Sequence, residues 1–464
     1  MRKNLPEILK LVIKLKGGLP INNNNSPRQT RASGGNQANT SSQSMQTQGQ
    51  MGVTSQTAAQ PRHPKGMMNS LATNFYHLRN PYTIAWWSMA YPGFGHISMG
   101  SYVTGFLLFI WEMVSNTQGK VNLAILYTFT GRYDMAKEVV DNRWLLLYPC
   151  VFIFAIWDSY RRAIKFNQRC ILADRAGAVI QQESFSVMEI NVLDKRSPWV
   201  AAFWSAVLPG LGHLYTHRVP TGFFLLVWWV TIAYFSSLYQ AVQYTWLGLF
   251  EQAKAVVRPE WLIFMPSVIG YAIYDAYVNT TEYNRLFSKE QASFFRKEYQ
   301  DPNFIMPVEV QSEVYVTACF EHHTLLELAI SELEQKGIVK QNICCIPIDV
   351  PQKERALFDT IHRADGLSMF DLACALGVVF MLFGVMWGFM WKWGPIAWGL
   401  IGMLFGWGLG FTFKYFYYKI YAKKQPAVGK TTELVMIVSC HKSEVEMVER
   451  VLAGHNALGI GRKG

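Results

Sequence analysis

Charged residues are scarce in this chain. Asp, Glu, Lys and Arg make up 16% of its 464 residues, whereas half of the residues are hydrophobic and 14% are aromatic. Soluble proteins carry about 25% charged residues, so the deficit argues against a soluble globular protein and predicts a polytopic membrane protein. The net charge of +11 does not predict nucleic-acid binding, because the Lys and Arg residues lie beside apolar segments, where they act as topology determinants.

Catalytic and metal-binding signatures are also missing. The seven cysteines show neither metal-ligand spacing nor a paired framework. No GxSxG, Walker, HExxH or dinucleotide-binding motif follows a predicted strand. We therefore expect no enzyme activity, no cofactor and no metal. His322-His323 and His441, with Glu321 nearby, leave a metal site open as an alternative to ordinary polar turns.

We expect no signal peptide in residues 1–17, because their apolar run is short and broken by lysines. Residues 1–17 can instead form an amphipathic interfacial helix or a frayed basic tail. The segment that follows is rich in Asn, Gln and Ser and has few bulky apolar residues. We expect residues 18–78 to be a disordered tail.

One motif occurs twice in the sequence. Pro92-Gly93-Phe94-Gly95-His96 returns as Pro209-Gly210-Leu211-Gly212-His213, 117 residues later (209 − 92). The same offset pairs further residues without a gap: Trp111 with Trp228, Pro149 with Pro266, Asp158 with Asp275, and Asn167 with Asn284. This constant register predicts a tandem parallel repeat, residues 79–167 and 196–284, joined by a linker at 168–195.

Each repeat is predicted to hold three helical pieces. The first is short and aromatic (82–91; 199–208), and the second begins at a Thr-Gly and is strongly apolar through Trp111 or Trp228. A semi-polar section (121–142; 238–258) leads to the third piece (144–157; 261–274), which has a central proline. We expect the second and third pieces to span the membrane; alternatively, the first and second do.

The last part of the chain mixes two patterns. Residues 308–350 and 430–464 each show strand, helix and strand signals, with Thr324 and Ser443 opening predicted capping boxes. Two such halves predict one small α+β ferredoxin-like domain. Residues 366–423 interrupt it as a transmembrane hairpin, with helices at 370–391 and 396–413, and residues 285–307 link it to the second repeat.

The hairpin carries glycines at four-residue spacing: Gly384 and Gly388 on its first helix, and Gly402, Gly406 and Gly410 on its second. Small residues on one stripe allow close helix packing in lipid. Besides the lipid bilayer, we expect a protein partner or self-association through this stripe and the ferredoxin-like domain.

Basic residues set the expected orientation. They follow each repeat and the hairpin, as expected of cytoplasmic segments: Arg161, Arg162, Lys165, Arg169, Arg175, Lys195 and Arg196; then Arg285, Lys289, Arg296 and Lys297; then Lys414, Lys419, Lys423, Lys424 and Lys430. We expect a multi-pass cell-membrane protein whose N-terminal tail and C-terminal domain are cytoplasmic.

Two resemblances follow from these motifs. Residues 308–464 resemble a bacterial general-stress-protein family through Cys319-Phe320-Glu321, Glu332-Leu333, Lys336-Gly337 and residues 434–438, although the hairpin is more aromatic here. The repeats resemble the two-transmembrane domain family through Gly93, His96, Gly105, Trp157 and Asp158, and again through Gly210, His213, Gly222 and Asp275, with a longer insert and with Tyr274 replacing the Trp. The first resemblance implies a fold and a stress-linked role, not a reaction.

The candidate functional residues are His96 and His213, with Asp158 and Asp275 as their candidate partners, which would make two equivalent proton- or ion-handling sites. Ionisable residues beside a broken helix in a membrane are costly and often functional. The structural alternative is that each histidine caps backbone groups left unpaired by the proline. Asp275 also lacks the arginines that follow Asp158, having Val278 and Asn279 there, which argues against a salt bridge common to both copies.

Three functions fit these features. The first is a non-enzymatic scaffold or stress-linked sensor of a bacterial inner membrane, with a cytoplasmic partner-binding domain. The second is a small transporter or channel that uses the four His and Asp residues at broken helices. The third, a membrane-embedded lipid enzyme, would use the same pairs. A transporter requires a water-accessible cavity that joins all four.

Overall fold

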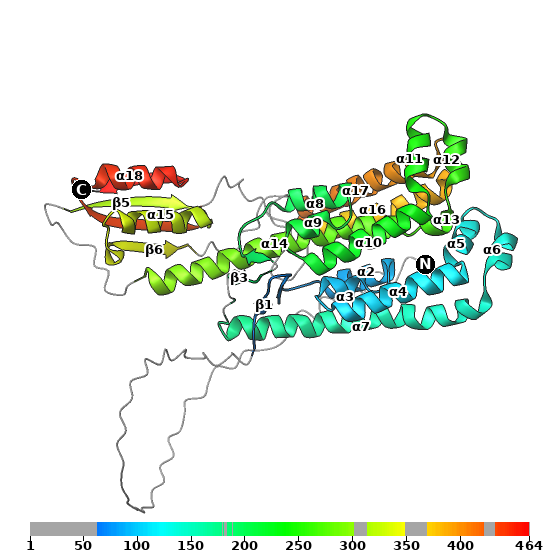
Figure 1. The fold of residues 1–464 in the computed structure, drawn as a ribbon, viewed down its shortest axis with the longest axis horizontal. Helices are drawn as coiled ribbons and strands as arrows, with labels where there is room; N and C mark the ends of the chain where they lie inside the picture. Colours follow the sequence, from blue (N-terminus) through cyan, green and yellow to red (C-terminus); the bar gives the residue numbers. More distant parts are fainter. Residues whose placement is uncertain are drawn as a thin grey trace, which may run out of the picture. The chain divides into compact units, whose positions relative to one another are not determined.

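The computed structural model describes residues 63–178, 180, 183–187, 189–300, 313–348, 369–421 and 432–463 (Figure 1). The possible amphipathic helix at 1–17 and residues 18–62 of the predicted tail lie outside the described residues. The described part is mostly helical, with small sheets.

The elements of the two repeats correspond at the predicted offset, with one exception. The first repeat consists of α2 (Pro81–Ala90), α3 (Phe94–Ser98), α4 (Tyr102–Gly119), α5 (Val121–Phe129), α6 (Tyr133–Val139) and α7 (Asn142–Arg175). The second consists of α8 (Pro198–Val207), α9 (Leu211–Tyr215), α10 (Val219–Phe235), α11 (Leu238–Trp246), α12 (Phe250–Val256), α13 (Pro259–Leu262) and α14 (Met265–Glu298). The exception is that α13 and α14 of the second repeat together match the single helix α7 of the first.

The repeated glycines allow a tight break between the first two helices of each copy. Gly93 and Gly210 have φ values of +104° and +109°, a region that favours glycine. A Cβ on Gly93 would lie 2.3 Å from the carbonyl oxygen of Gly105, and the equivalent distance from Gly210 to Gly222 is 2.4 Å. The backbone approach explains why a glycine recurs twelve residues after each turn.

Each repeat begins earlier than predicted, with a short β-hairpin. β1 (Gly66–Met68) pairs with β2 (Thr73–Phe75), and β3 (Glu183–Phe185) pairs with β4 (Ile190–Val192), again 117 residues apart. The prediction of disorder was therefore wrong for the described residues 63–78, and the 168–195 linker contains a hairpin. The Asn69 side chain, which accepts hydrogen bonds from the Leu71 and Ala72 N–H groups, stabilises the first turn.

The third helical piece is much longer than predicted in both copies. α7 and α14 each run for 34 residues, through the basic segments that the sequence assigned to linkers. Lys, Arg and Glu are good helix formers, so the basic segments after each apolar run do not end the helix. Pro149 lies inside α7, whereas its counterpart Pro266 lies in the first turn of α14, after a break at Ile263–Phe264.

Aromatic side chains from both repeats fill one apolar core. Phe94 of α3 stacks on Tyr271 of α14 with ring centroids 4.0 Å apart, and Phe106 stacks on Phe224 at the same distance. Such pairs contribute about 0.5–1.5 kcal/mol beyond their buried area. The two repeats therefore share one hydrophobic core instead of forming separate domains.

Three helices among the described residues are long and apolar enough to cross a membrane: Pro259–Glu298, Phe370–Gly388 and Gly394–Tyr417. Two bent pairs would qualify as further spans, α6 with α7 at 93° and α10 with α11 at 65°. At ten residues, α2 and α8 reach about 15 Å, half the thickness of a bilayer core. The alternative in which these first pieces span is therefore not supported.

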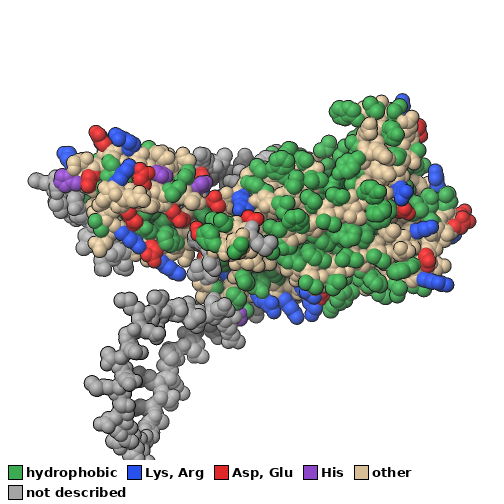
Figure 2. Space-filling view, in the orientation of Figure 1, with side chains coloured by type: hydrophobic (Ala, Val, Ile, Leu, Met, Phe, Trp, Pro, Cys, Tyr) green, Lys and Arg blue, Asp and Glu red, His purple; other side chains and the backbone are tan. Residues whose placement is uncertain are grey.

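Hydrophobic side chains cover the outer surface of the helical module. Figure 2 shows them gathered over the helical module, and exposed examples include Trp246 at 89%, Leu146 at 77% and Tyr234 at 77% in the repeats and Leu404 at 63% in the hairpin helix Gly394–Tyr421. Soluble monomers rarely expose contiguous apolar patches beyond about 300–600 Å². A lipid environment would account for this surface.

The glycine stripe packs within its own hairpin. α16 (Met369–Gly388) and α17 (Gly394–Tyr421) lie so close that a Cβ on Gly402 would meet the Phe380 carbonyl oxygen at 2.1 Å. Added Cβ atoms on the remaining four would meet the facing helix or the turn at similarly short distances: 2.2 Å at Gly384, 2.6 Å at Gly388, 2.4 Å at Gly406 and 2.5 Å at Gly410. The stripe therefore packs the two helices of the hairpin against each other, and association with a protein partner or a second copy stays a prediction.

The remaining strands form one antiparallel sheet in the order β6-β7-β5-β8. The strands are β5 (Glu313–Phe320), β6 (Ile343–Pro347), β7 (Leu434–His441) and β8 (Gly459–Lys463), with α15 (Thr324–Gln335), the 3₁₀ turn η1 (Lys340–Asn342) and α18 (Val445–Gly454) between them. With the hairpin set aside, this is the β-α-β-β-α-β order of a ferredoxin-like sandwich. The α16–α17 hairpin replaces the turn between neighbouring strands β6 and β7.

Neither predicted capping box forms as expected. The side chain of His323, not Thr324, accepts the N–H of Leu325 at the start of α15. At α18 the cap residue is Glu444, not Ser443, and its carboxylate accepts the N–H of His441. Each helix therefore begins one residue away from the predicted position, and both remain amphipathic.

Candidate functional site

The structure brings the four predicted site residues together as two equivalent pairs. His96 Nε2 lies 3.2 Å from Asp158 Oδ2, and His213 Nε2 lies 3.2 Å from Asp275 Oδ2. All four side chains are at most 1% exposed. The Pro-Gly break positions each histidine on the five-residue helix α3 or α9, facing the long helix of its own repeat.

Each imidazole bonds to a carboxylate and not to a backbone carbonyl. An ionised carboxylate only accepts hydrogen bonds, so the Nε2 atom carries the proton that points at the aspartate. His96 Nδ1 and His213 Nδ1 are buried without a hydrogen-bond partner among the described residues. The geometry thus favours the predicted His–Asp pairing over the alternative of a backbone cap.

The cations around the two aspartates come from different elements. Arg161 and Arg162, one turn further along α7, both bond to Asp158, with Arg162 Nε 2.6 Å from Oδ2. Asp275 instead pairs with Arg218, which lies just before α10. The argument against a salt bridge common to both copies was therefore wrong, because the arginine of the second copy lies 57 residues before the aspartate rather than within one helical turn after it.

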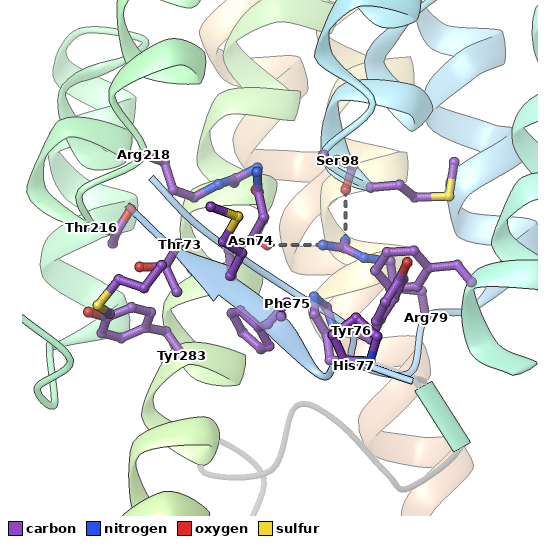
Figure 3. A pocket seen from close by; sticks show the side chains of 18 residues that line it. Thr73, Asn74, Phe75, Tyr76, His77, Arg79, Ser98, Thr216, Arg218 and Tyr283 are labelled. Atoms are coloured by element: carbon purple, nitrogen blue, oxygen red, sulfur yellow. Dashed lines mark hydrogen bonds between the residues drawn. The ribbon is translucent and has the colours of Figure 1, made fainter. Parts of the chain in front are cut away.

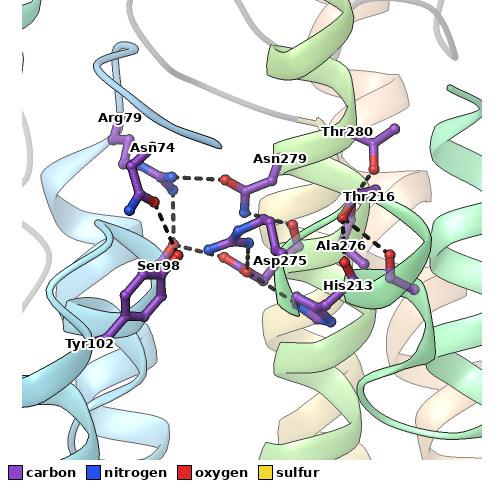
Figure 4. A network of polar contacts seen from close by, with 12 residues as sticks. Asn74, Arg79, Ser98, Tyr102, His213, Thr216, Asp275, Ala276, Asn279 and Thr280 are labelled. Carbon is purple, nitrogen blue, oxygen red and sulfur yellow. Dashed lines mark hydrogen bonds and ion pairs between the residues drawn. The ribbon is translucent and has the colours of Figure 1, made fainter. Parts of the chain in front are cut away.

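Asp275 is also bonded across the repeat boundary. Ser98 of α3 donates to Asp275 Oδ1 at 2.9 Å, and Arg79 donates to Ser98 Oγ at 2.8 Å and to Asn279 Oδ1 at 3.0 Å (Figure 4). The network joins the first repeat to α14. Asp158 has no equivalent bond to the second repeat among the described residues, so only one of the two pairs connects the copies.

A second contact, which recurs in both repeats, was not predicted from the sequence. Asn167 accepts the Arg79 N–H at 2.9 Å and donates to the Arg79 carbonyl at 2.7 Å, and Asn284 makes the same two bonds with Arg196. These side chains fasten the entry of each repeat to its long helix. The arginine and the asparagine each recur at the offset of 117 residues, and this recurrence could have predicted the contact.

A pocket of about 620 Å³ lies beside this network (Figure 3). Hairpin β1–β2 supplies much of its lining, and Arg79, Ser98, Arg218 and Asn279 face it as well. His96, His213, Asp158 and Asp275 do not line it. This pocket is therefore not the water-accessible cavity, joining all four residues, that a transporter would require.

α14 continues from the helical module into the ferredoxin-like domain. Phe295 is fully buried in the core of that domain, together with Val316, Leu333 and Val438. Gln291, one turn earlier, donates to Glu327 Oε1 at 2.7 Å and to the His323 carbonyl at 3.1 Å. One helix therefore carries Asp275 of the polar network and an apolar anchor of the domain.

The candidate histidines of the last domain, His322, His323 and His441, lie at this junction and in the turns instead of sharing a site. His322 Nδ1 lies 3.0 Å from Gln291 Oε1, and burial lowers the pKa of His322 to about 4. Burial alone would raise the pKa of Glu433, but Lys195 and the backbone N–H of His322 lower it. His441 is exposed and contacts Ser443. Within the described residues, no cluster of three His, Cys, Asp or Glu side chains could hold a metal ion.

No protein-family model, curated protein or solved structure matches this chain. The class that the fold defines is that of a mostly helical chain with three candidate membrane spans and small sheets.

Proposed function

We propose that this chain is a non-enzymatic scaffold or sensor of a bacterial inner membrane. In this proposal the two repeats and the hairpin are polytopic membrane elements with the same orientation. The ferredoxin-like domain lies in the cytoplasm and binds a protein partner. The resemblance to general stress proteins and to the two-transmembrane domain family is part of the same proposal.

The observation that carries the proposal is the continuity of α14. It contributes Tyr271 and Asp275 to the helical module and, after five more turns, Phe295 to the core of the domain. A shift of this helix would therefore displace side chains in both the helical module and the ferredoxin-like domain. That coupling suits a sensor or an anchored scaffold, whereas a transporter has no need of a domain fixed to its central helix.

The transporter alternative has less support. Both His–Asp pairs are sealed, and arginines balance their charge. Breaking a buried pair of this kind costs about 3–5 kcal/mol, which is a sufficient structural reason for the residues to be there. Proton or ion passage would need these groups to meet water.

Photo-crosslinking in native membranes tests the proposal. A crosslinker at Leu328, which is 51% exposed on α15, should give discrete protein adducts; the matched position Leu404, 63% exposed on α17, should give lipid adducts. In parallel, vesicles containing the purified chain should conduct no more protons or ions than empty vesicles. Absence of adducts at Leu328, together with flux abolished by His213→Ala, would favour the transporter.

A further inference from the structure

The pocket beside the polar network has the dimensions and the opening of a ligand site. Its volume of about 620 Å³ lies within the roughly 300–1,000 Å³ typical of small-molecule sites. Met67 lines it and is 70% exposed, so the pocket reaches the surface at hairpin β1–β2. Residues of both repeats meet there.

The inner end of the pocket carries more positive than negative charge. Arg79 and Arg218 both line it and are only 6% and 7% exposed, and none of the lining residues is acidic. Asp275, just behind, pairs with Arg218. Of the two buried guanidinium groups, only that of Arg218 therefore contacts a carboxylate.

Arg79 is the cation without a carboxylate of its own. Its NH1 and NH2 groups donate to the neutral Ser98 and Asn279 oxygens, and its guanidinium lies 5.8 Å from the Phe166 ring centroid. Its Nε atom is buried without a hydrogen-bond partner, and no carboxylate lies within 4 Å of it in the described part of the chain. Glu282, a buried carboxylate on the same side of α14, pairs with Arg285 and lies 3.8 Å from His77 Nδ1; its charge reaches Arg79 only at longer range. A buried unpaired charge is costly, so an anion in the pocket would offset that cost.

The equivalent arginine of the second repeat shows that this arrangement is not required by the fold. Arg196 donates to the Tyr215 carbonyl at 2.6 Å, lies 5.5 Å from the Tyr283 ring centroid and does not line this pocket. Its side chain is partly exposed. Ser98 and Arg218 also have no counterpart of the same type, since Tyr215 and Ser101 occupy those positions. The two copies have therefore diverged at the pocket.

We infer that this pocket binds an oxyanion, with Arg79 as its principal contact and an amphiphile as the preferred carrier. Guanidinium groups match phosphate and carboxylate oxygens, and the Ser98 and Asn279 side chains lie beside Arg79. Met67, Met68, Phe75 and Phe166 supply an apolar wall for an acyl chain. The phosphate of an anionic phospholipid combines both features. This inference holds whether or not the domain recruits a partner.

Retention of lipid by the full-length chain tests the inference. The protein would be purified in detergent with phosphatidylglycerol, and bound lipid would be counted by native mass spectrometry. Arg79→Gln should weaken binding at least about tenfold, since hydrogen bonds to charged groups contribute about 1.5–3 kcal/mol. Arg196→Gln, the matched control, should bind like the unaltered chain.

Two variants at Met67 test the pocket independently, in case the Arg79→Gln variant does not fold. Met67 lies at the exposed rim, so Met67→Glu should weaken retention by repulsion and Met67→Lys should not. The change in melting temperature on addition of inorganic phosphate distinguishes a free oxyanion from a lipid headgroup as the ligand. Stabilisation by phosphate without lipid retention would identify a free oxyanion as the ligand, and lipid retention alone would identify the amphiphile. Equal binding by the unaltered chain, a folded Arg79→Gln variant and Met67→Glu would overturn the inference.

Discussion

At the residue scale, the two His–Asp pairs have the same geometry but different surroundings. The arginines that bond to Asp158 have side chains that are 45% and 37% exposed, whereas the Arg218 side chain beside Asp275 is 9% exposed. A partly exposed arginine can turn towards water when its partner is lost, and a buried one cannot. The burial of the cation, more than that of the carboxylate, therefore decides what each pair contributes.

Neutralising the two aspartates should give unequal losses of stability. Asp275→Asn should lower the free energy of unfolding by about 3–5 kcal/mol, because Arg218 is left buried and unpaired. Asp158→Asn should cost about 1–2 kcal/mol, mainly through the weakened hydrogen bond to His96. Denaturant unfolding of the purified chain in detergent, followed by tryptophan fluorescence, measures both.

Each variant is the control for the other, because both remove one buried charge from equivalent positions. Equal losses would mean that the arginine partners do not determine stability. The sequence could predict the pairing, since all four residues recur at one offset. It could not predict Arg218, because the first repeat has Ser101 at that position and pairs its aspartate within one helix.

At the element scale, α14 connects two apolar cores. Its first turns pack in the aromatic core of the repeats, and Phe295 near its end is fully buried under the sheet of the ferredoxin-like domain. The preceding residue, Phe294, is 38% exposed. Two adjacent phenylalanines on one helix thus differ only in which face they occupy.

Phe295→Ala should loosen the domain from α14 and leave the repeats intact. Removal of a buried phenylalanine costs about 3–5 kcal/mol, whereas Phe294→Ala should cost less than about 1 kcal/mol. Hydrogen exchange followed by mass spectrometry should show faster exchange in β5 and β7 and unchanged exchange in α3 and α4. Faster exchange throughout the chain, or the same effect from Phe294→Ala, would argue against α14 as the connecting element.

The sequence predicted these elements unevenly, for physical reasons. The helix breaks at Pro92 and Pro209 were predicted correctly, because Pro-Gly leaves few other conformations. Strands β1 and β3 were missed, because three residues are too few to show an alternating pattern. The ends of α7 and α14 were misplaced, because basic residues mark a change of environment without interrupting a helix.

At the scale of the whole molecule, we propose that both repeats enter the membrane in the same direction. Equivalent elements, a shared core and equivalent hairpins describe a parallel duplication. If α7 and α14 both emerge on the same side of the membrane, the β1–β2 and β3–β4 hairpins and the ferredoxin-like domain lie together on that side. The α5–α6 and α11–α12 turns would then lie on the opposite side.

The most direct test is labelling of single cysteines by a membrane-impermeant maleimide in a chain without its native cysteines. Arg175→Cys and Lys297→Cys, at the ends of the two long helices, should be labelled only after the membrane is opened. Arg132→Cys and Leu249→Cys, exposed positions 117 residues apart (249 − 132) in the turns before α6 and α12, should be labelled in intact cells. Labelling of Arg175→Cys and Lys297→Cys from opposite sides would contradict the parallel arrangement.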